Sequence, residues 1–95
     1  MQAFSKRIRD RIRRILVRND VQQASLFGSF AQGRPGRHSD VDILVQFRGQ
    51  KSLLDLVGLK LELEETLRRN VDVLTYDAIH PSLREKILRE QVAIL

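Results

Sequence analysis

The feature that most constrains this chain is a glycine–serine pair followed, after ten residues, by two aspartates at alternate positions. Gly28 and Ser29 end one apolar stretch, and Asp40 and Asp42 open another that runs through residues 43–45. Alternate residues of a β-strand point to the same face, with Cα atoms about 6 to 7 Å apart. Both carboxylates therefore share one face of a predicted strand. Paired acids in that place are typical of a site for a divalent cation.

Three familiar ligand-binding motifs do not fit these residues. The spacing of Gly28 and Gly33 matches the first half of a P-loop, but the required Lys-Ser/Thr pair does not follow Gly33. The glycines also lack the Gly-x-Gly-x-x-Gly spacing of a dinucleotide-binding fold. An EF-hand loop beginning at Asp40 would need glycine where Val45 stands.

The expected secondary structure brings a third acid to the same place. Periodicity and turn residues predict helices at 3–18, at 52–69 and from Pro81 onward, a short helical turn at 29–32, and strands at 21–27, 40–47 and 70–76. The long helix between the second and third strands is a crossover, which makes those strands parallel and brings Asp72 level with Asp40 and Asp42. The first strand must run antiparallel to the second for its glycine–serine turn to face the acids. In that second strand, Val41, Ile43, Val45 and Phe47 point into the core.

Helix starts are also marked in the sequence. Ser52 with Asp55, and Ser82 with Glu85, predict capping boxes at the starts of the second long helix and of the last helix. The apolar residues Leu83, Ile87 and Ile94 are expected on the inner face of the last helix.

These elements predict one domain, residues 1–95, of the α/β (α+β) class. We expect a small mixed three-stranded sheet flanked by helices, in the order α-β-(short α)-β-α-β-α. No apolar run approaches the ~18 residues needed to cross a membrane, so no membrane partner is expected. The chain has no cysteine, which permits a reducing compartment, and we expect it in the cytoplasm.

The acids and the glycine–serine turn together predict a site for metal ions and a phosphate-bearing ligand. Three carboxylates close together repel one another unless a cation compensates, and all-oxygen ligands favour Mg2+ or Mn2+ over zinc. Gly28 allows the backbone to approach phosphates, and Ser29 offers a hydroxyl and an N–H at a helical start. Arg34 and Arg37, in the loop before the acids, are further candidates for phosphate contacts. In such a site, two metal ions can activate an attacking hydroxyl and neutralise a leaving group.

The bipartite motif resembles the signature of the nucleotidyltransferase superfamily that includes DNA polymerase β. The run Gly28-Ser-Phe-Ala-Gln-Gly33, followed by Ser39-Asp-Val-Asp-Ile-Leu-Val45, is most similar to that of the minimal nucleotidyltransferases. The resemblance covers most of the chain, from about residue 21 to the C-terminus, and implies the polymerase β-like palm fold. Gln32 stands where many relatives carry arginine.

This resemblance also implies residue roles and a partner. Asp40 and Asp42 would bind both metal ions, and Asp72 would bind the catalytic ion and help to deprotonate the acceptor. Minimal nucleotidyltransferases are often the antitoxin half of a two-gene module with a HEPN-domain toxin. The implied activity is protein adenylylation (AMPylation), in which AMP from ATP is attached to a hydroxyl of that toxin, most simply a tyrosine. The alternatives are a non-catalytic antitoxin that covers the toxin, and a catalytic subunit that modifies a small molecule or an RNA end.

Charge and apolar surface are unevenly distributed along the sequence. Residues 1–37 hold nine basic and two acidic side chains, whereas residues 38–95 hold eight basic and ten acidic ones. A basic N-terminal helix suits contact with RNA or another polyanion, although a solvated helix explains the charge as well. The predicted helix at 52–69 carries more leucine than one sheet contact requires, which indicates either a fully covered helix or a partner.

Overall fold

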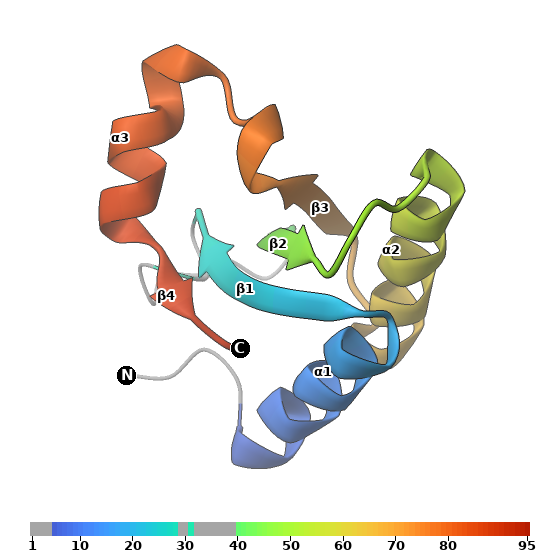
Figure 1. Cartoon of the computed structure of the whole chain (residues 1–95). Coiled ribbons are helices and arrows are strands. Elements are labelled where there is room, and N and C mark those ends of the chain that lie inside the picture. The colour runs from blue at the N-terminus through green and yellow to red at the C-terminus, as the bar shows by residue number, and fades with distance from the viewer. Residues whose placement is uncertain (1–4, 29–30, 32–39) are drawn as a thin grey trace.

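In the computed structural model, a four-stranded mixed sheet is covered on one face by two helices (Figure 1). The structure describes residues 5–28, 31 and 40–95. The elements are α1 (Lys6–Arg18), β1 (Val21–Phe27), β2 (Val41–Phe47), α2 (Leu53–Leu67), β3 (Val71–Thr75), the 3-10 helix η1 (Tyr76–Ala78), α3 (Pro81–Glu90) and β4 (Val92–Ala93). The mixed α/β class is confirmed. The short helical turn predicted at 29–32 lies almost entirely outside the described residues.

The sheet has the predicted strand directions and one strand more than predicted. Its order is β3-β2-β1-β4, with β1 antiparallel to β2 and β2 parallel to β3. The prediction of three strands was wrong because β4 is only two residues long and both are exposed. A strand this short and exposed has no apolar periodicity from which it could be predicted. It forms because the C-terminal backbone pairs with the free edge of β1, as in the bond from the Ile94 N–H to the Ala24 carbonyl at 3.0 Å.

The last helix departs from the prediction at both ends and on its inner face. Its N-cap is His80, whose Nδ1 accepts from the Ser82 N–H at 3.2 Å, so the capping box predicted from Ser82 and Glu85 was wrong. Pro81 occupies the first turn as predicted, where a missing N–H costs nothing. The helix ends at Glu90, well before the predicted inner-face residue Ile94. It buries no residue, which leaves α3 peripheral to the core.

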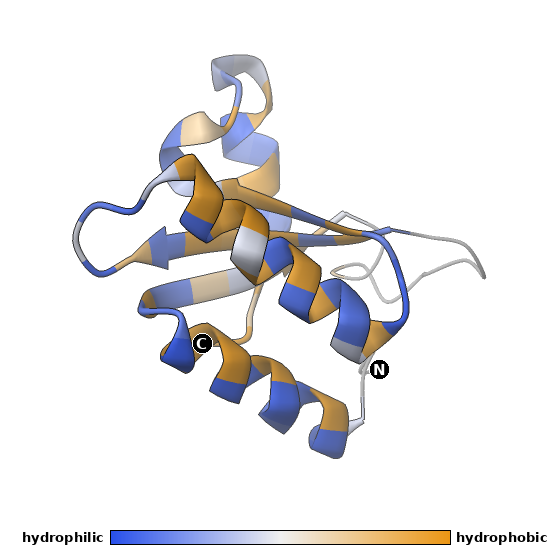
Figure 2. Cartoon of the chain, turned by 90° about the vertical axis from the view of Figure 1, so that its right-hand side faces the viewer, coloured by the Kyte–Doolittle hydropathy of each residue, from blue (hydrophilic) through white to orange (hydrophobic). Residues whose placement is uncertain are grey.

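The hydrophobic core lies between α1, α2 and one face of the sheet. α1 alternates between hydrophobic and hydrophilic positions (Figure 2), and three of its apolar side chains are buried. α2 contributes two fully buried leucines, and β2 contributes its core-facing valines and isoleucine as predicted. The best-buried members are Ile12, Leu16, Val41, Ile43, Val45, Leu59, Leu63 and Val71. Along the described residues, none of the helices is long and apolar enough to span a membrane.

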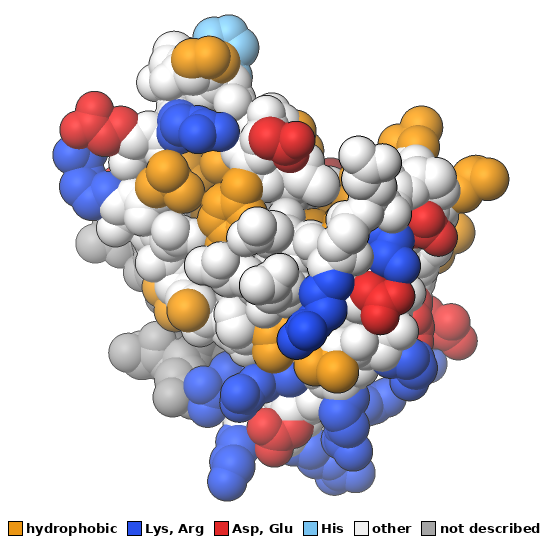
Figure 3. Space-filling view, in the orientation of Figure 1, with side chains coloured by type: hydrophobic (Ala, Val, Ile, Leu, Met, Phe, Trp, Pro, Cys, Tyr) orange, Lys and Arg blue, Asp and Glu red, His pale blue; other side chains and the backbone are white. Residues whose placement is uncertain are grey.

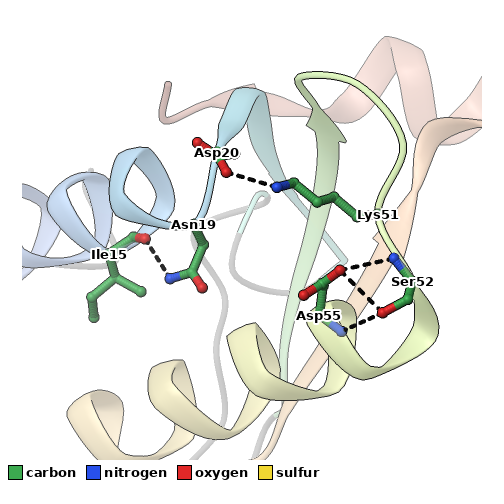
Figure 4. Close-up of polar contacts among 6 residues, drawn as sticks. All are labelled: Ile15, Asn19, Asp20, Lys51, Ser52 and Asp55. Atoms are coloured by element: carbon green, nitrogen blue, oxygen red, sulfur yellow. Dashed lines mark hydrogen bonds and ion pairs between the residues drawn. The ribbon is translucent and has the colours of Figure 1, made fainter.

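Polar contacts fix the turns beside this core (Figure 4). At the end of α1, the Asn19 side-chain amide donates to the Ile15 carbonyl at 2.8 Å, and Asp20 then turns the chain with a φ of 62°. The Lys51 ammonium group, between β2 and α2, lies 2.7 Å from Oδ2 of Asp20, between α1 and β1, and the ion pair joins the two connections. Ser52 caps α2 in the predicted capping box with Asp55, whose carboxylate accepts from the Ser52 N–H at 2.9 Å. The capping box of Ser52 and Asp55 fixes the residue at which α2 begins.

Candidate active site

Two aspartates meet across neighbouring strands near the starts of β2 and β3. Asp42 and Asp72 are direct partners in the parallel register, and Phe27, the last residue of β1, pairs with Asp42 on its other side. Residues paired across a sheet point to the same face. Because Val41 and Ile43 point into the core, these two carboxyl groups lie on the opposite face. The crossover topology predicted from the sequence thus brings Asp72 level with Asp42.

The pairing of the two acids perturbs Asp42. The pKa of Asp42 is raised to about 6, chiefly by partial burial and then by the negative charge of Asp72, a hydrogen bond between the two carboxyl groups, and the charge of Asp40. A hydrogen bond between two carboxyl groups requires a proton on one of them. At neutral pH, above this pKa, Asp42 is mostly ionised, and a bound cation would offset the cost of its negative charge beside Asp72.

Gly28 lies against the same carboxylate. Its φ is +71°, in the left-handed region that favours glycine, and a Cβ atom there would overlap Oδ2 of Asp42. The sequence suggested that this glycine lets the backbone approach phosphates. The structure adds a second reason, which is that only glycine leaves space for the Asp42 carboxyl group directly after β1.

The other predicted site residues are not all gathered with this pair. Asp40 is exposed immediately before β2, close enough for its charge to act on Asp42. Within residues 5–28, 31 and 40–95, no group of three or more histidine, cysteine or acidic side chains is arranged to hold a metal ion. The oxygen donors of Asp42 and Asp72 nevertheless fit a hard cation such as Mg2+. Ser29, Arg34 and Arg37 lie outside the described residues.

Next to the acids, the middle of the same face of the sheet is covered. Leu44 and Ser25, which pair with each other across β1 and β2, are 0% and 2% exposed. The Ser25 hydroxyl lies 3.0 Å from the Tyr76 hydroxyl, which donates to Gln91 Oε1 at 3.2 Å. This network connects η1 and the end of α3 to the sheet.

A pocket of about 410 Å³ opens beside the two acids, between α2 and β3. Besides Asp42 and Asp72, it is lined by Phe27, Leu56, Val57, Lys60, Val73 and Leu74. The sequence did not assign these lining residues to the site. The surplus of apolar residues in the predicted helix 52–69 did, however, indicate that part of this helix would be left uncovered. A larger hollow of about 640 Å³ at the far end of β2 and β3 contains neither member of the acid pair.

The family model for polymerase β nucleotidyltransferases matches residues 10–95. The chain therefore belongs to the polymerase β nucleotidyltransferase family, and the resemblance drawn from the glycine–serine and aspartate motifs is confirmed. The predicted enzyme class, nucleotidyltransferase, is confirmed with it.

Relatives in archaea and a solved complex refine this assignment. The chain is 53% identical over 88 residues to a Methanocaldococcus jannaschii protein provisionally named a protein adenylyltransferase, covering 93% of this chain and 95% of that protein. It is 32% identical over 94 residues to protein adenylyltransferase MntA of Thermococcus cleftensis, covering 99% and 88%. A solved structure described as a toxin–antitoxin with AMP-PNP is similar with a TM-score of 0.80 and 25% identity, covering 92% of this chain and 72% of that one.

Proposed function

We propose that this chain is a magnesium-dependent protein adenylyltransferase that transfers AMP from ATP to a tyrosine hydroxyl of a HEPN ribonuclease toxin, and that it thereby acts as the antitoxin. The observation that carries the proposal is the in-register pair of Asp42 and Asp72, placed directly against Gly28. The names of the two archaeal relatives support adenylylation of a protein, and the toxin–antitoxin complex with AMP-PNP supports both the nucleotide and the partner.

The roles of the residues follow from their positions across the sheet. Asp42, on the central strand, together with Asp40 and Asp72, would hold Mg2+ or Mn2+. The bound ions supply charge neutralisation for the leaving pyrophosphate and lower the pKa of the attacking hydroxyl. The turn that begins at Gly28 would place backbone N–H groups and the Ser29 hydroxyl against the triphosphate. Arg34 and Arg37, in the loop that follows this turn, would contribute positive charge to the phosphates.

Adenylylation would inactivate a ribonuclease by adding a bulky anion. AMP attached to a tyrosine near an RNA-binding surface blocks that surface by size, and its phosphate repels the RNA backbone. The modification is covalent, so inactivation would persist after the two proteins separate. A binding antitoxin without transfer activity would instead release an active toxin on separation.

The test uses the full chain and the HEPN-domain protein that we expect to be encoded beside it. The two proteins are incubated with Mg2+ and ATP and separated under dissociating conditions, and the partner is then assayed for intact mass and for ribonuclease activity. We expect the partner to gain AMP on a tyrosine and to remain inactive. An unmodified partner that regains full activity once separated would reject adenylylation in favour of neutralisation by binding. A control with the α,β-methylene analogue of ATP, whose bridge between the α- and β-phosphates cannot be cleaved, should leave the partner unmodified.

A further inference from the structure

The charges of α1 are arranged against the stability of the helix. Its 13 residues include seven basic side chains and one acid, Asp10. The basic residues begin in the first turn, which holds no acidic side chain, so positive charge lies at the positive end of the helix dipole. Several arginines also follow one another at spacings of three and four residues, at which like charges repel. Departures of this kind from local preference are expected at functional sites.

Four exposed arginines form a row along one side of α1, and we call this the arginine row. Its members are Arg7, Arg11, Arg14 and Arg18. A hollow of about 360 Å³ between α1 and α2 is lined by the last three of them and, on the α2 side, by Glu62 and Thr66. At 1.5 Å per residue the row is about 17 Å long. Figure 3 shows basic side chains gathered over the lower edge of the molecule, where Figure 1 places α1.

The arginine row complements a strand of phosphates. A guanidinium group binds a phosphate through two parallel hydrogen bonds, and a row of this length can follow several phosphates of one nucleic-acid strand. The apolar side of α1 is buried against the sheet through Ile12, Ile15 and Leu16, so the helix is held in place and cannot enter a groove as a whole. The row can therefore contact the backbone of a nucleic acid, which carries no sequence information directly.

The opposite wall of the hollow favours RNA over DNA. Glu62 pairs with Arg18 and accepts from the Asn19 side-chain amide at 3.0 Å, which fixes the position of its carboxylate. An ionised carboxylate has about four acceptor sites, so Glu62 can also accept from a ribose 2′-hydroxyl. The Thr66 hydroxyl can donate to or accept from the same group, which DNA lacks. Cationic groups on one wall and oxygen groups on the other match a ribose–phosphate backbone.

We infer that the hollow between α1 and α2, together with the arginine row, is an RNA-binding site that holds the backbone of base-paired RNA without reading its sequence. The helix fixes the spacing of the row, which suits the regular phosphates of a base-paired strand. The site lies on the helix-covered side of the sheet, whereas Asp42 and Asp72 lie on the other face. This inference goes beyond the proposed function and does not depend on it.

Binding is tested by fluorescence anisotropy with the full chain, without ATP or partner protein. The probes are a fluorescein-labelled RNA duplex and a DNA duplex of the same length and sequence, each titrated over a range of salt concentrations. We expect tighter binding of the RNA duplex, and equal binding of RNA duplexes of unrelated sequence. Arg11→Gln/Arg14→Gln should weaken RNA binding at least about tenfold and lower the slope of log K against log salt by about 2. Thr66→Val should weaken binding of RNA and leave that of DNA unchanged.

A charge-matched control separates a site from general attraction. Lys86→Gln/Arg89→Gln removes two exposed cations from α3 and should bind RNA as wild type. Equal loss from the two double variants would overturn the inference, because net charge alone would then explain binding. It would also be overturned by no saturable binding of the RNA duplex at low salt, or by binding of the DNA duplex as tight as that of RNA.

The folded state and the proposed function are checked on the same variants. The substituted arginines are exposed and repel one another, so Arg11→Gln/Arg14→Gln should melt no lower than wild type, and Arg14→Gln alone is a milder second variant. AMP transfer to the partner protein by the double variant should match wild type, because the acids lie on the other face of the sheet. Loss of transfer together with RNA binding would overturn the assignment of a separate site. Loss of RNA binding alone leaves adenylylation untouched.

Discussion

Two kinds of acidic side chain in this chain differ in what they face: some accept hydrogen bonds from the protein, and others lie against another acid. Asp55 and Glu64 are matched by donors of the protein itself. Asp55 accepts from the N–H and hydroxyl of Ser52, and Glu64 accepts from the Val71 N–H at 3.0 Å and from Lys60. These hydrogen bonds, the backbone ones foremost, lower the pKa of both carboxyl groups. Asp42 instead faces another acid, and its pKa is raised.

The difference separates acids that build the fold from acids that await a ligand. Asp55 caps the start of α2, and Glu64 ties the end of α2 to the first residue of β3. Hydrogen bonds within the folded chain therefore already stabilise the negative charge of both. Among the described residues, the Asp42 and Asp72 carboxyl groups face each other rather than such donors, and a bound cation would supply positive charge to the pair. Neutralising a fold-building acid should therefore cost stability and spare catalysis, whereas neutralising Asp42 should do the reverse.

The largest expected effect is the loss of transfer on neutralising the site acids. Asp42→Asn and Asp72→Asn should each lower AMP transfer by about 10³-fold, because metal-borne charge stabilisation supplies several kcal/mol to the transition state. Transfer is measured with ATP labelled at the α-phosphate and the partner protein. Glu85→Gln, an exposed acid on α3, is the control and should transfer as wild type. Equal rates in Asp42→Asn and wild type would remove Asp42 from the reaction.

A glycine pair separates backbone strain from crowding of the site. Gly28 and Gly49 have nearly the same φ, +71° and +72°, but a Cβ atom at Gly49 meets nothing within 4 Å. Gly28→Ala and Gly49→Ala should each lose about 1 to 2 kcal/mol of unfolding free energy, because the left-handed region disfavours a side chain. Only Gly28→Ala displaces the Asp42 carboxylate, and a misplacement of about 1 Å costs roughly 100-fold in rate. Equal transfer by both variants would show that the contact with Asp42 is dispensable.

The sequence predicted the acid pair better than it predicted the end of the chain, for a physical reason. Asp42 and Asp72 converge because apolar strands and a crossover helix leave only one arrangement of β2 and β3, and such strands have strong periodicity. β4 has no periodic signal, since two exposed residues form it through backbone bonds to β1. His80 replaced the predicted cap because its ring nitrogen accepts a backbone N–H, which residue preferences for caps do not anticipate.

The pocket illustrates a different limit of sequence reasoning. The leucine surplus of α2 was evident, but helical periodicity does not say which side chains the neighbouring strand leaves open. Leu59 and Leu63 are fully buried, whereas Leu54 and Leu61 on the same helix are exposed. That division depends on how α2 crosses β3 and α1, which is set by the packing of all three elements together.

The pH dependence of stability should distinguish the two kinds of acid. The folded pKa of Asp42 is raised from 3.8 to about 6, so ionised Asp42 destabilises the metal-free fold above pH 6, and protonation relieves this as the pH falls. Between pH 7.5 and 5 the metal-free wild type should gain at most about 1 kcal/mol from this group, allowing for solvent screening. Asp55 and Glu64, with lowered pKa values, contribute stability above about pH 4 that is lost as the pH falls further.

Denaturant unfolding in the presence of a chelator checks this behaviour. Asp42→Asn should be more stable than wild type at pH 7.5, and the advantage should shrink at pH 5. A constant difference between the two proteins across this range would mean that Asp42 does not titrate there. Added Mg2+ and ATP should stabilise wild type and leave Asp42→Asn almost unchanged.

The smallest expected effect concerns the cap of α2, the element that carries the fold-building acids. Ser52→Ala removes the hydroxyl that accepts from the Asp55 N–H at 3.3 Å and donates to the Asp55 carboxylate at 3.0 Å. The loss should be about 1 kcal/mol of unfolding free energy, as for other N-cap serines, with AMP transfer unchanged at a temperature where both proteins are folded. Ser52→Asp restores an acceptor for the helix N-terminus but places a second anion beside Asp55, so it should recover only part of the stability. If Ser52→Ala lowers the rate of AMP transfer as well as the stability, the start of α2 helps to position Asp42 and Asp72. The acids that build the fold and the acids that await a ligand would then not be independent of each other.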